Sequence, residues 1–307
     1  MLLLSNPFSA DFMVRALVGG TLVAVVCGVV GTWVVVRGMA FLGEAIGHGM
    51  LPGVALATVL GAPVLLGGAV SAAVMSAAIG SMQRSGRLSY DTAIGLLFVG
   101  MLSLGVIIVS HSASFATDAT ALLFGEVLAM QDSDVLLLAA ALVVTLVVAA
   151  AFHRSFVVTA FDPRIAHTLG VRPGAAQVAL VGLVTVAVVA SYQAVGTLLV
   201  VGLLLGPVVA ANRWTRRIPM TMVLASALGT LSVLVGLLVS WYAATAAGAS
   251  IACTAILLAT SSALLRGLVD RWRDRDLRDD GHGDARAAVH DRPADRASAA
   301  VPQRGVS

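Results

Sequence analysis

The sequence contains no lysine, so all 19 of its basic residues are arginine. The phosphate-binding loop GxxxxGK[ST] requires a lysine, and this absence excludes nucleotide hydrolysis of that type within the chain. Only two cysteines occur, Cys27 and Cys253, and both lie in apolar runs, where cysteine behaves as a small hydrophobic residue. We therefore expect neither a disulfide framework nor a thiolate metal site.

Charge is scarce as well. Charged residues make up 11% of the 307 residues, against roughly 25% in an ordinary soluble domain, while 59% are hydrophobic. The expected fold class is all-α, as a polytopic membrane protein, because helices satisfy their backbone hydrogen bonds within the segment that crosses the lipid. We expect no nucleic-acid partner. No cleavable signal is expected either, since the start, MLLLSNPFSADFMVR, has no basic residue ahead of its apolar ones.

Nine apolar runs approach the roughly 20 residues that a helix needs to cross the hydrocarbon core. They fall at about 15–36, 38–60, 64–82, 93–110, 134–152, 177–192, 195–211, 220–241 and 248–266. Tight turns at 61–63 and 192–196 leave an eight-span alternative open, in which two short segments form one interrupted hairpin. After the last run the composition changes to Arg, Asp, Gly, Ala and Pro, which cannot bury a core. We therefore expect a transmembrane permease domain over 1–268 and a disordered cytoplasmic tail over 269–307.

The arginines lie almost entirely in loops that a nine-span count places on one side. Besides those of the tail, they are Arg37, Arg84, Arg87, Arg154, Arg164, Arg172, Arg213, Arg216 and Arg217. Only Arg15 falls on the other side, and this asymmetry places the N-terminus outside and the C-terminus in the cytoplasm. The outer loop at about 111–134 carries other polar residues, namely His111, Asp118, Glu126, Asp132 and Asp134. That loop is either a solvated surface loop or a region that receives cations.

An acid and a histidine stand inside the second run, in the stretch 37–53, RGMAFLGEAIGHGMLPG. Glu44 and His48 are four residues apart, so on a helix they lie one turn apart on the same face. Pro52 lies a further turn along and has no N–H, which leaves the carbonyl oxygen of His48 without its usual helical partner. A rise of ~1.5 Å per residue from Gly38 places His48 ~15 Å deep, near the middle of a core ~30 Å thick.

A carboxylate, an imidazole and a free carbonyl that converge on one point form a candidate cation site. A charge near the bilayer centre costs roughly 2.5–3.5 kcal/mol on insertion scales, and such residues usually mark a path for ions or substrates. The alternative is structural, with Glu44 as an interfacial charge at a helix start and His48 as an interior histidine whose hydrogen bonds are satisfied.

Between the fifth and sixth runs, the stretch 161–173, FDPRIAHTLGVRP, predicts a very short helix on the arginine-rich side. Asp162 is a favourable N-cap and Pro163 fits the first helical position. Gly170 fits the residue just past the end of the helix. A rigid element of this kind suits docking to a partner, although a capped surface turn without a role has the same signature.

The seventh run places glycines at positions 196, 202 and 206 before Pro207. Small residues let helices approach closely in lipid, and proline permits a bend. We expect a packing helix beside a transport path that Pro52 and Pro207 help to shape.

Five stretches in order carry a resemblance. They are RGMAFLGEAIGHGMLPGVALA (37–57), DTAIG (91–95), LFGEVL (123–128), FDPRIAHTLGV (161–171) and VGTLLV through Gly206-Pro207 (195–207). Together they resemble the membrane permeases of bacterial manganese and zinc ABC importers, over roughly residues 10–265. This resemblance implies a fold like that of a type II ABC importer permease.

By this resemblance, Glu44 and His48 match the acid and the histidine of the family's second helix, and 161–171 matches its cytoplasmic coupling segment. We expect Ile165 and Leu169, one turn apart on one face, to contact the ATPase. The family usually has aspartate where this chain has glutamate, and a small polar residue in place of Gly47. The longer carboxylate and the lost hydroxyl leave the metal preference open. Oxygen and imidazole ligands suit manganese or zinc, and they do not exclude ferrous iron.

The resemblance implies a permease subunit of an ATP-driven metal importer in the bacterial cell membrane, not itself an enzyme and without a permanent cofactor. Its partners would be a second copy of the chain, a cytoplasmic ATP-binding subunit and an extracellular metal-binding protein. Two alternatives stay open. A secondary, ion-coupled transporter would show internal repeats with matched broken helices. An intramembrane metalloenzyme would need an open metal position and a general base, and the chain has no HExxH motif.

Overall fold

The computed structural model describes residues 10–84, 89–110, 125–161 and 173–290. Within these ranges the chain is helical and contains no strand. The chain divides into two compact units, Met1–Ser262 and Ala263–Ser307. Described residues of the second unit are helical as far as His290.

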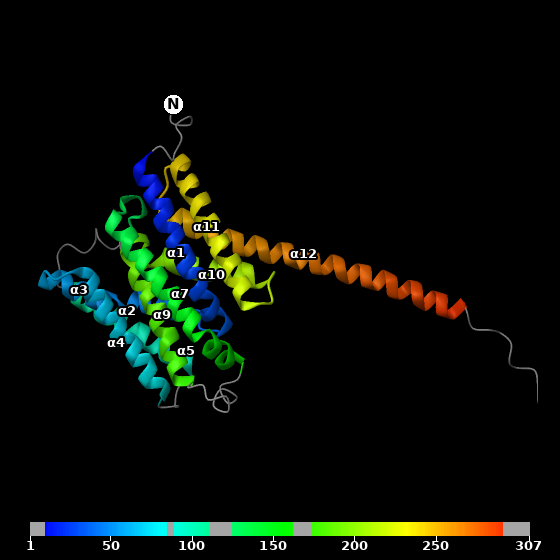
Figure 1. Ribbon diagram of the computed structural model, residues 1–307, viewed down its shortest axis with the longest axis horizontal. Helices are drawn as coiled ribbons and strands as arrows, with labels where there is room; N and C mark the ends of the chain where they lie inside the picture. The colour runs from blue at the N-terminus through cyan, green and yellow to red at the C-terminus, as the bar shows by residue number, and fades with distance from the viewer. Residues whose placement is uncertain (1–9, 85–88, 111–124, 162–172, 291–307) are drawn as a thin grey trace, which may run out of the picture. The chain divides into compact units, whose positions relative to one another are not determined.

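Every predicted apolar run is helical (Figure 1). The helices are α1 (Asp11–Val36), α2 (Phe41–Gly49), α3 (Leu51–Leu60), α4 (Val64–Arg84), α5 (Tyr90–Ser110), α7 (Asp132–Phe161), α9 (Pro173–Val195), α10 (Thr197–Asn212), α11 (Ile218–Ala243) and α12 (Ala247–His290), with a 3-10 turn η3 (Val127–Ala129) before α7. In the described part, seven of these helices are long and apolar enough to cross a membrane. The second predicted span is divided between α2 and α3, and α10 has 16 residues. The all-α, polytopic fold class is confirmed, and the count of nine spans is close to the observed arrangement.

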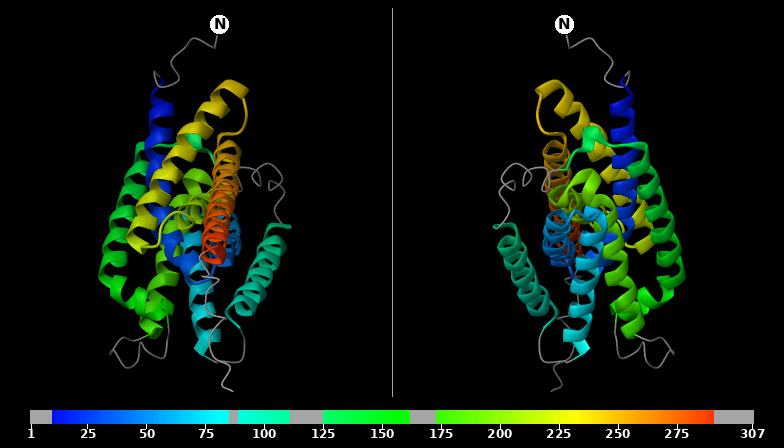
Figure 2. Two further views of the ribbon diagram at one scale, coloured as in Figure 1. Left: turned by 90° about the vertical axis from the view of Figure 1, so that its right-hand side faces the viewer. Right: turned by 90° about the vertical axis from the view of Figure 1, so that its left-hand side faces the viewer.

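α1 is the helix around which the first unit is packed. α7, α9, α10 and α11 all pack against it, and Figure 2 shows α1 between α7 and α11. Its most apolar stretch is 61% buried, whereas the corresponding value for the other six long helices is 17–50%. Trp33, near its end, is fully buried and meets the Phe156 ring of α7 edge-on at 5.2 Å. α1 is therefore interior although it is the first helix of the chain.

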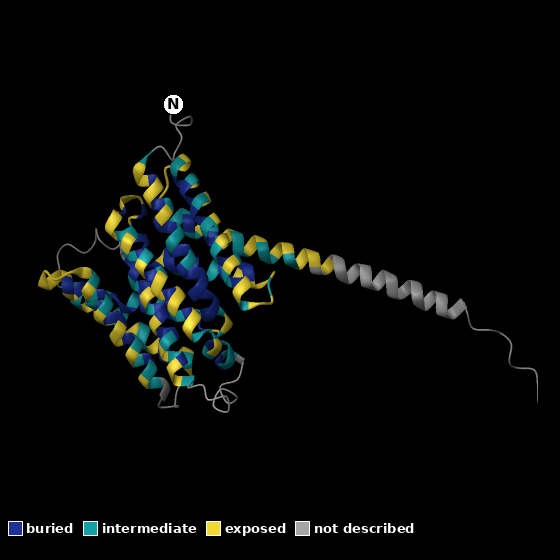
Figure 3. Cartoon of the chain, in the orientation of Figure 1, coloured by how far each residue is buried: buried dark blue, intermediate teal, exposed yellow. Residues whose placement is uncertain are grey.

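The outer face of α7 is exposed in large part (Figure 3), and large apolar side chains of both α5 and α7 are exposed. Exposed large side chains on these two helices include Leu96, Val99, Leu136, Val143 and Val147. In water, apolar surface of this extent would mark an interaction site. Lipid tails are as apolar as these side chains, so the same faces are stable in a bilayer.

α3 and α4 approach each other through two glycines. A Cβ built on Gly53 would lie 2.1 Å from the carbonyl oxygen of Gly67, and one on Gly67 would lie 2.3 Å from that of Gly53. Only glycine permits this distance between two backbones. α3 then ends at Gly61, whose φ of +66° is the left-handed conformation common after a helix. The turn predicted at 61–63 is therefore confirmed.

α9 and α10 are separated by Gly196 alone. This residue has φ +73° and ψ 165°, a conformation that favours glycine because it has no Cβ. α9 continues through Tyr192 to Val195. The turn predicted over 192–196 is thus shorter than expected, and Thr197 follows the break as the first residue of α10.

Composition predicts disorder from residue 269, and the described chain is helical as far as His290. Alanine and arginine are strong helix formers, and acid and base four residues apart stabilise a solvated helix, so a segment that lacks a core can still be helical. Residues 291–307 lie outside the described part.

Candidate functional site

α2 carries the candidate site and is held by packing more than by helix propensity. Its nine residues have no capping side chain and include glycines, each of which costs roughly 1 kcal/mol relative to alanine in a helix interior. Leu42 and Ile46 are fully buried, and the helix packs against α4, α5, α9 and α10. The glycines allow this close packing, because a Cβ built on Gly43 would lie 2.6 Å from Leu204 of α10.

Glu44 and His48 lie on the same face of α2, as their spacing predicts. Nδ1 of His48 lies 3.4 Å from Oε1 of Glu44 and 3.2 Å from the main-chain oxygen of the same residue. The side chain of His48 is 15% exposed and that of Glu44 is 30% exposed. On another side, the His48 ring meets the ring of Phe98 on α5 edge-on, with centroids 5.3 Å apart. The imidazole is thus held between a carboxylate and an aromatic ring.

The spacing of these two donors suits a shared metal ion. Bonds from zinc to carboxylate oxygen or imidazole nitrogen are about 2.0–2.2 Å long, so two donors in adjacent positions around one such ion lie about 3–3.5 Å apart. The observed separation of 3.4 Å falls in this range. Among the described residues, no group of three or more His, Cys, Asp or Glu side chains comes together. Glu44 and His48 could therefore supply two ligands of a metal site, and no third side chain of these types joins them in the described part.

Pro52 lies in the first turn of α3, and the helix divides at Met50. The N–H of Met50 donates to the carbonyl oxygen of Ile46 at 3.1 Å. The carbonyl oxygen of His48 as a ligand, and the role of Pro52 in shaping a path, stay predictions. Pro207 is buried inside α10, which continues past it to Asn212, and its role in shaping a path stays a prediction.

Arg37 joins the turn before α2 to two other helices. It follows the last residue of α1, and its guanidinium donates to Oε1 of Gln177 on α9 at 2.8 Å and to Oγ1 of Thr159 on α7. The guanidinium carbon also lies 5.8 Å from the centre of the Phe156 ring, within cation–π range. Burial lowers the pKa of Arg37, but an arginine stays charged at neutral pH. One cation thus ties together the ends of α1 and α7 and the start of α9.

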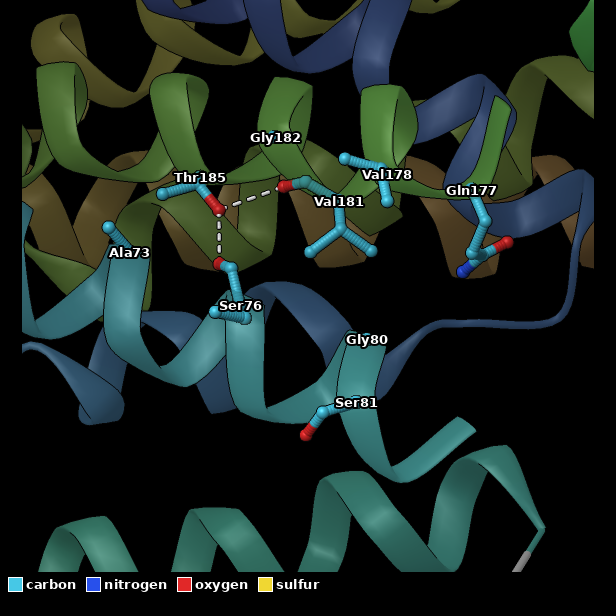
Figure 4. A pocket seen from close by; sticks show the side chains of 10 residues that line it. Ala73, Ser76, Gly80, Ser81, Gln177, Val178, Val181, Gly182 and Thr185 are labelled. Atoms are coloured by element: carbon cyan, nitrogen blue, oxygen red, sulfur yellow. Dashed lines mark hydrogen bonds between the residues drawn. The ribbon is translucent and has the colours of Figure 1, made fainter. Parts of the chain in front are cut away.

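A groove of about 500 Å³ lies between α4 and α9, and Gln177 forms part of its wall (Figure 4). Ser76 and Thr185 share a hydrogen bond of 2.7 Å across the two helices. The other lining residues are mostly small and apolar, and no carboxylate or imidazole is among those described. The groove therefore lacks the charged ligand that a divalent cation site requires.

Thr197 begins α10, and its side chain lies against α2. A Cβ built on Gly47 would lie 3.3 Å from Cγ2 and 3.6 Å from Cβ of Thr197. Gly47 is three residues after Glu44, one turn away on α2, and directly precedes His48. Thr197 is 4% exposed, and its hydroxyl has no hydrogen-bond partner within the described ranges. Sequence reasoning did not single it out, because a threonine inside an apolar run carries no charge or periodic signal.

Two of the acidic residues predicted on the outer side have structural partners. Asp132 forms an ion pair with Arg15, with 3.5 Å between Oδ1 and Nε, and both side chains are exposed. Asp134 accepts a hydrogen bond of 2.9 Å from the main-chain N–H of Gln131, at the start of α7. These contacts favour a structural role for both acids. Residues 111–124 of the same loop lie outside the described part.

The predicted ATPase-coupling residues all lie outside the described part of the chain. They are Asp162, Pro163, Ile165, Leu169 and Gly170. The structure locates the two helix ends that flank them, Phe161 of α7 and Pro173 of α9. The short capped helix between these ends stays a prediction.

Comparison with known proteins gives consistent matches. Residues 9–266 match the family described as the ABC 3 transport family. The chain is 33% identical over 258 residues to the manganese transport system membrane protein MntC of Listeria monocytogenes, which covers 84% of this chain and 92% of that protein. It is 31% identical over 242 residues to the chelated iron transport system membrane protein YfeD of Yersinia pestis, covering 78% and 80%. Among solved structures, it is similar to PsaBC from Streptococcus pneumoniae in complex with Fab, with a TM-score of 0.73 and 31% identity over 83% of this chain and 92% of that one.

Proposed function

Because this chain belongs to the ABC 3 transport family, we propose that it conducts manganese through the cell membrane, with zinc and ferrous iron as alternatives. The chain is the permease subunit of an ATP-driven importer of a divalent transition metal, and it is a transport component, not an enzyme. Manganese is placed first because the MntC relative is named for it, and iron is kept because YfeD is named for chelated iron. Zinc is kept as an alternative substrate only because carboxylate and imidazole ligands also suit it.

The pair formed by Glu44 and His48 carries the proposal. A carboxylate and an imidazole 3.4 Å apart can bind one divalent ion, and the pair lies within a helix packed among four others. Ionisable residues at such positions in a membrane protein usually face a path for ions. Carboxylate oxygen favours manganese, whereas imidazole is compatible with several transition metals.

We propose that the working importer contains two copies of this chain, a cytoplasmic ATP-binding subunit and an extracellular metal-binding protein. Family membership supports these partners. The absence of a lysine-containing phosphate loop supports an ATPase on another chain. Membership in this family also favours the ATP-driven importer over the ion-coupled secondary transporter.

We propose that the N-terminus lies outside the cell and the C-terminus in the cytoplasm. The ion pair between Arg15 and Asp132 joins the starts of α1 and α7 on one side. Arg37 joins the end of α1 to the end of α7 and the start of α9. Each contact therefore connects segments that the nine-span count assigns to the same side. The side that contains Arg37 is the arginine-rich one, which favours the cytoplasm.

The segment that joins α7 to α9 is the proposed contact with the ATPase. Arg37 holds the two flanking helices close to their ends, through Thr159 and Gln177. A displacement of this segment would therefore act on the turn that leads into α2. Such a connection is what transmission of force from an ATPase to Glu44 and His48 requires.

The test is manganese uptake by variants of the site. Glu44→Gln removes the charge while keeping the size, and His48→Leu removes the imidazole ligand. Each should abolish uptake, while the protein still reaches the membrane in normal amounts. Asp11→Asn is the matched control, because it removes an exposed carboxylate at the start of α1 and should leave uptake unchanged. Wild-type uptake by both site variants would show that these residues are structural.

A further inference from the structure

We infer that the hydroxyl of Thr197 supplies a neutral oxygen to the cation at Glu44 and His48, directly or through one water, and thereby favours manganese over zinc. The inference rests on the proposed function of this pair. It assigns to α10 a residue of the ion path that lies in a different helix from the two charged ligands.

The first observation is the unpaired state of this hydroxyl. Buried polar side chains in native proteins are nearly always hydrogen-bonded, and an exception calls for an explanation such as a water or an ion. Thr197 is 4% exposed, and its Oγ1 has no partner in the described part of the chain. Many other described threonines donate to the carbonyl four residues earlier, as Thr32 does to Gly28 at 2.7 Å. Thr197 is the first residue of α10, and its hydroxyl forms no such bond to the carbonyl four residues earlier.

The second observation is its position opposite the site. Gly47 lies one turn from Glu44 on α2 and directly before His48, and it has no side chain of its own. Thr197 of α10 occupies the space beside it, since its Cγ2 lies 3.3 Å from where a Cβ of Gly47 would be. A threonine side chain has three staggered χ1 rotamers, and one rotation of about 120° places the hydroxyl in the position that the methyl occupies. The hydroxyl can therefore be presented to this face of α2.

The third observation is the helix break beside Thr197. α9 ends at Val195, one residue before the glycine with positive φ. The last carbonyls of a helix lack intrahelical donors and form the negative end of its dipole, which attracts cations. In transporters, the ends of broken helices at the binding site coordinate ions in this way. The hydroxyls of Ser191 and Tyr192, in the last turns of α9, are also buried without a partner in the described part.

The chemistry of an added hydroxyl points to manganese. Zinc is usually satisfied by four ligands and accepts imidazole and thiolate readily, whereas manganese takes six ligands that are mostly oxygens. One carboxylate and one imidazole leave several positions open around either ion. Each neutral oxygen added from Thr197 or its bound water therefore benefits manganese more than zinc.

The test compares four variants in the assembled importer, by uptake of manganese and of zinc as separate substrates. Thr197→Val keeps the shape and removes the hydroxyl. It should raise the manganese concentration needed for half-maximal uptake about ten- to a hundredfold, the usual effect of losing a group that supports a metal ligand, and should lower the ratio of manganese to zinc uptake. Thr197→Ser should restore most of the manganese preference. Thr197→Cys should shift the preference towards zinc, because thiolate is a softer ligand.

Thr145→Val is the matched control. Thr145 is also fully buried, and its hydroxyl has no partner within the described ranges, but it lies on α7, which does not carry the site. Without metal, both valine variants should be at least as stable as the wild type, since each loses an unsatisfied polar group. Only Thr197→Val should lose part of the rise in melting temperature that manganese produces.

The outcomes separate this inference from the proposed function. If Thr197→Val transports manganese with wild-type half-saturation while Glu44→Gln is inactive, the inference is wrong and the proposed function stands. If Glu44→Gln transports normally, the proposed function itself fails. Should the valine variant not fold, a wild-type ratio of manganese to zinc uptake in Thr197→Cys would overturn the inference.

Discussion

The hydrogen bonds of Arg37 predict how much this one residue stabilises the first unit. Arg37→Met keeps a long apolar stem and removes the guanidinium that bonds Gln177 and Thr159. Hydrogen bonds to a charged group contribute roughly 1.5–3 kcal/mol each. Arg37 is only partly buried, so the lower value applies to each bond. The expected loss in free energy of unfolding is therefore about 3 kcal/mol.

Arg37→Lys separates charge from geometry. Lysine keeps the positive charge but cannot hold two helices with a planar fork, so about half of the stabilisation should be lost. Combining Arg37→Met with Gln177→Leu tests the bond directly, because partners in contact show coupling energies of roughly 0.5–3 kcal/mol. For this pair, whose nitrogen and oxygen are 2.8 Å apart, we expect about 1–1.5 kcal/mol, the contribution of one charge-assisted bond at partial burial.

The assay is reversible unfolding of the purified protein by SDS in mixed micelles, followed by circular dichroism. Arg15→Met is the control, since the ion pair of Arg15 with Asp132 is exposed and should contribute less than about 1 kcal/mol. A free energy of unfolding for Arg37→Met within about 0.5 kcal/mol of the wild type, the range of neutral surface changes, would refute the reasoning. Zero coupling between Arg37 and Gln177 would refute the assignment of the bond.

Two further predictions concern topology and energy coupling. With both native cysteines replaced by serine, Ala246→Cys, which is exposed between α11 and α12, should react with an impermeant thiol reagent added outside cells. Asn212→Cys at the end of α10 should not, and its labelling from outside would contradict the nine-span orientation. Changing Ile165 and Leu169 together to Asp should release the ATPase during purification in detergent and stop ATP-dependent metal uptake into vesicles. A double variant that keeps its ATPase and transports normally would show that 162–169 is not the coupling segment.

The sequence by itself determined the membrane-spanning helices, the family and the shared face of Glu44 and His48. A helix needs about 20 apolar residues to cross the lipid, so each span can be recognised from one continuous hydrophobic run in the sequence. The two charged residues lie within nine consecutive positions, and helix geometry alone brings them together. The family follows from short motifs of consecutive residues, and the match of residues 9–266 to the ABC 3 transport family confirms it.

Where two local effects compete, the sequence does not show which of them prevails. The tail from residue 269 has the composition of a disordered segment and also the residues of a solvated helix, and in the described part it is helical as far as His290. The carbonyl of His48, which loses one donor to Pro52, stays a predicted ligand.

Only the tertiary structure decided which distant residues meet. Arg37 and Gln177 are 140 positions apart in the chain, and no periodicity connects them. Thr197 reaches Gly47 only because a glycine on α2 and a break after α9 let two helix backbones come close. Such contacts depend on how whole helices pack in lipid, where small residues and unpaired polar groups set the distances between helices. The two candidate charged ligands can therefore be found from the sequence, and a neutral residue of another helix, such as Thr197, cannot.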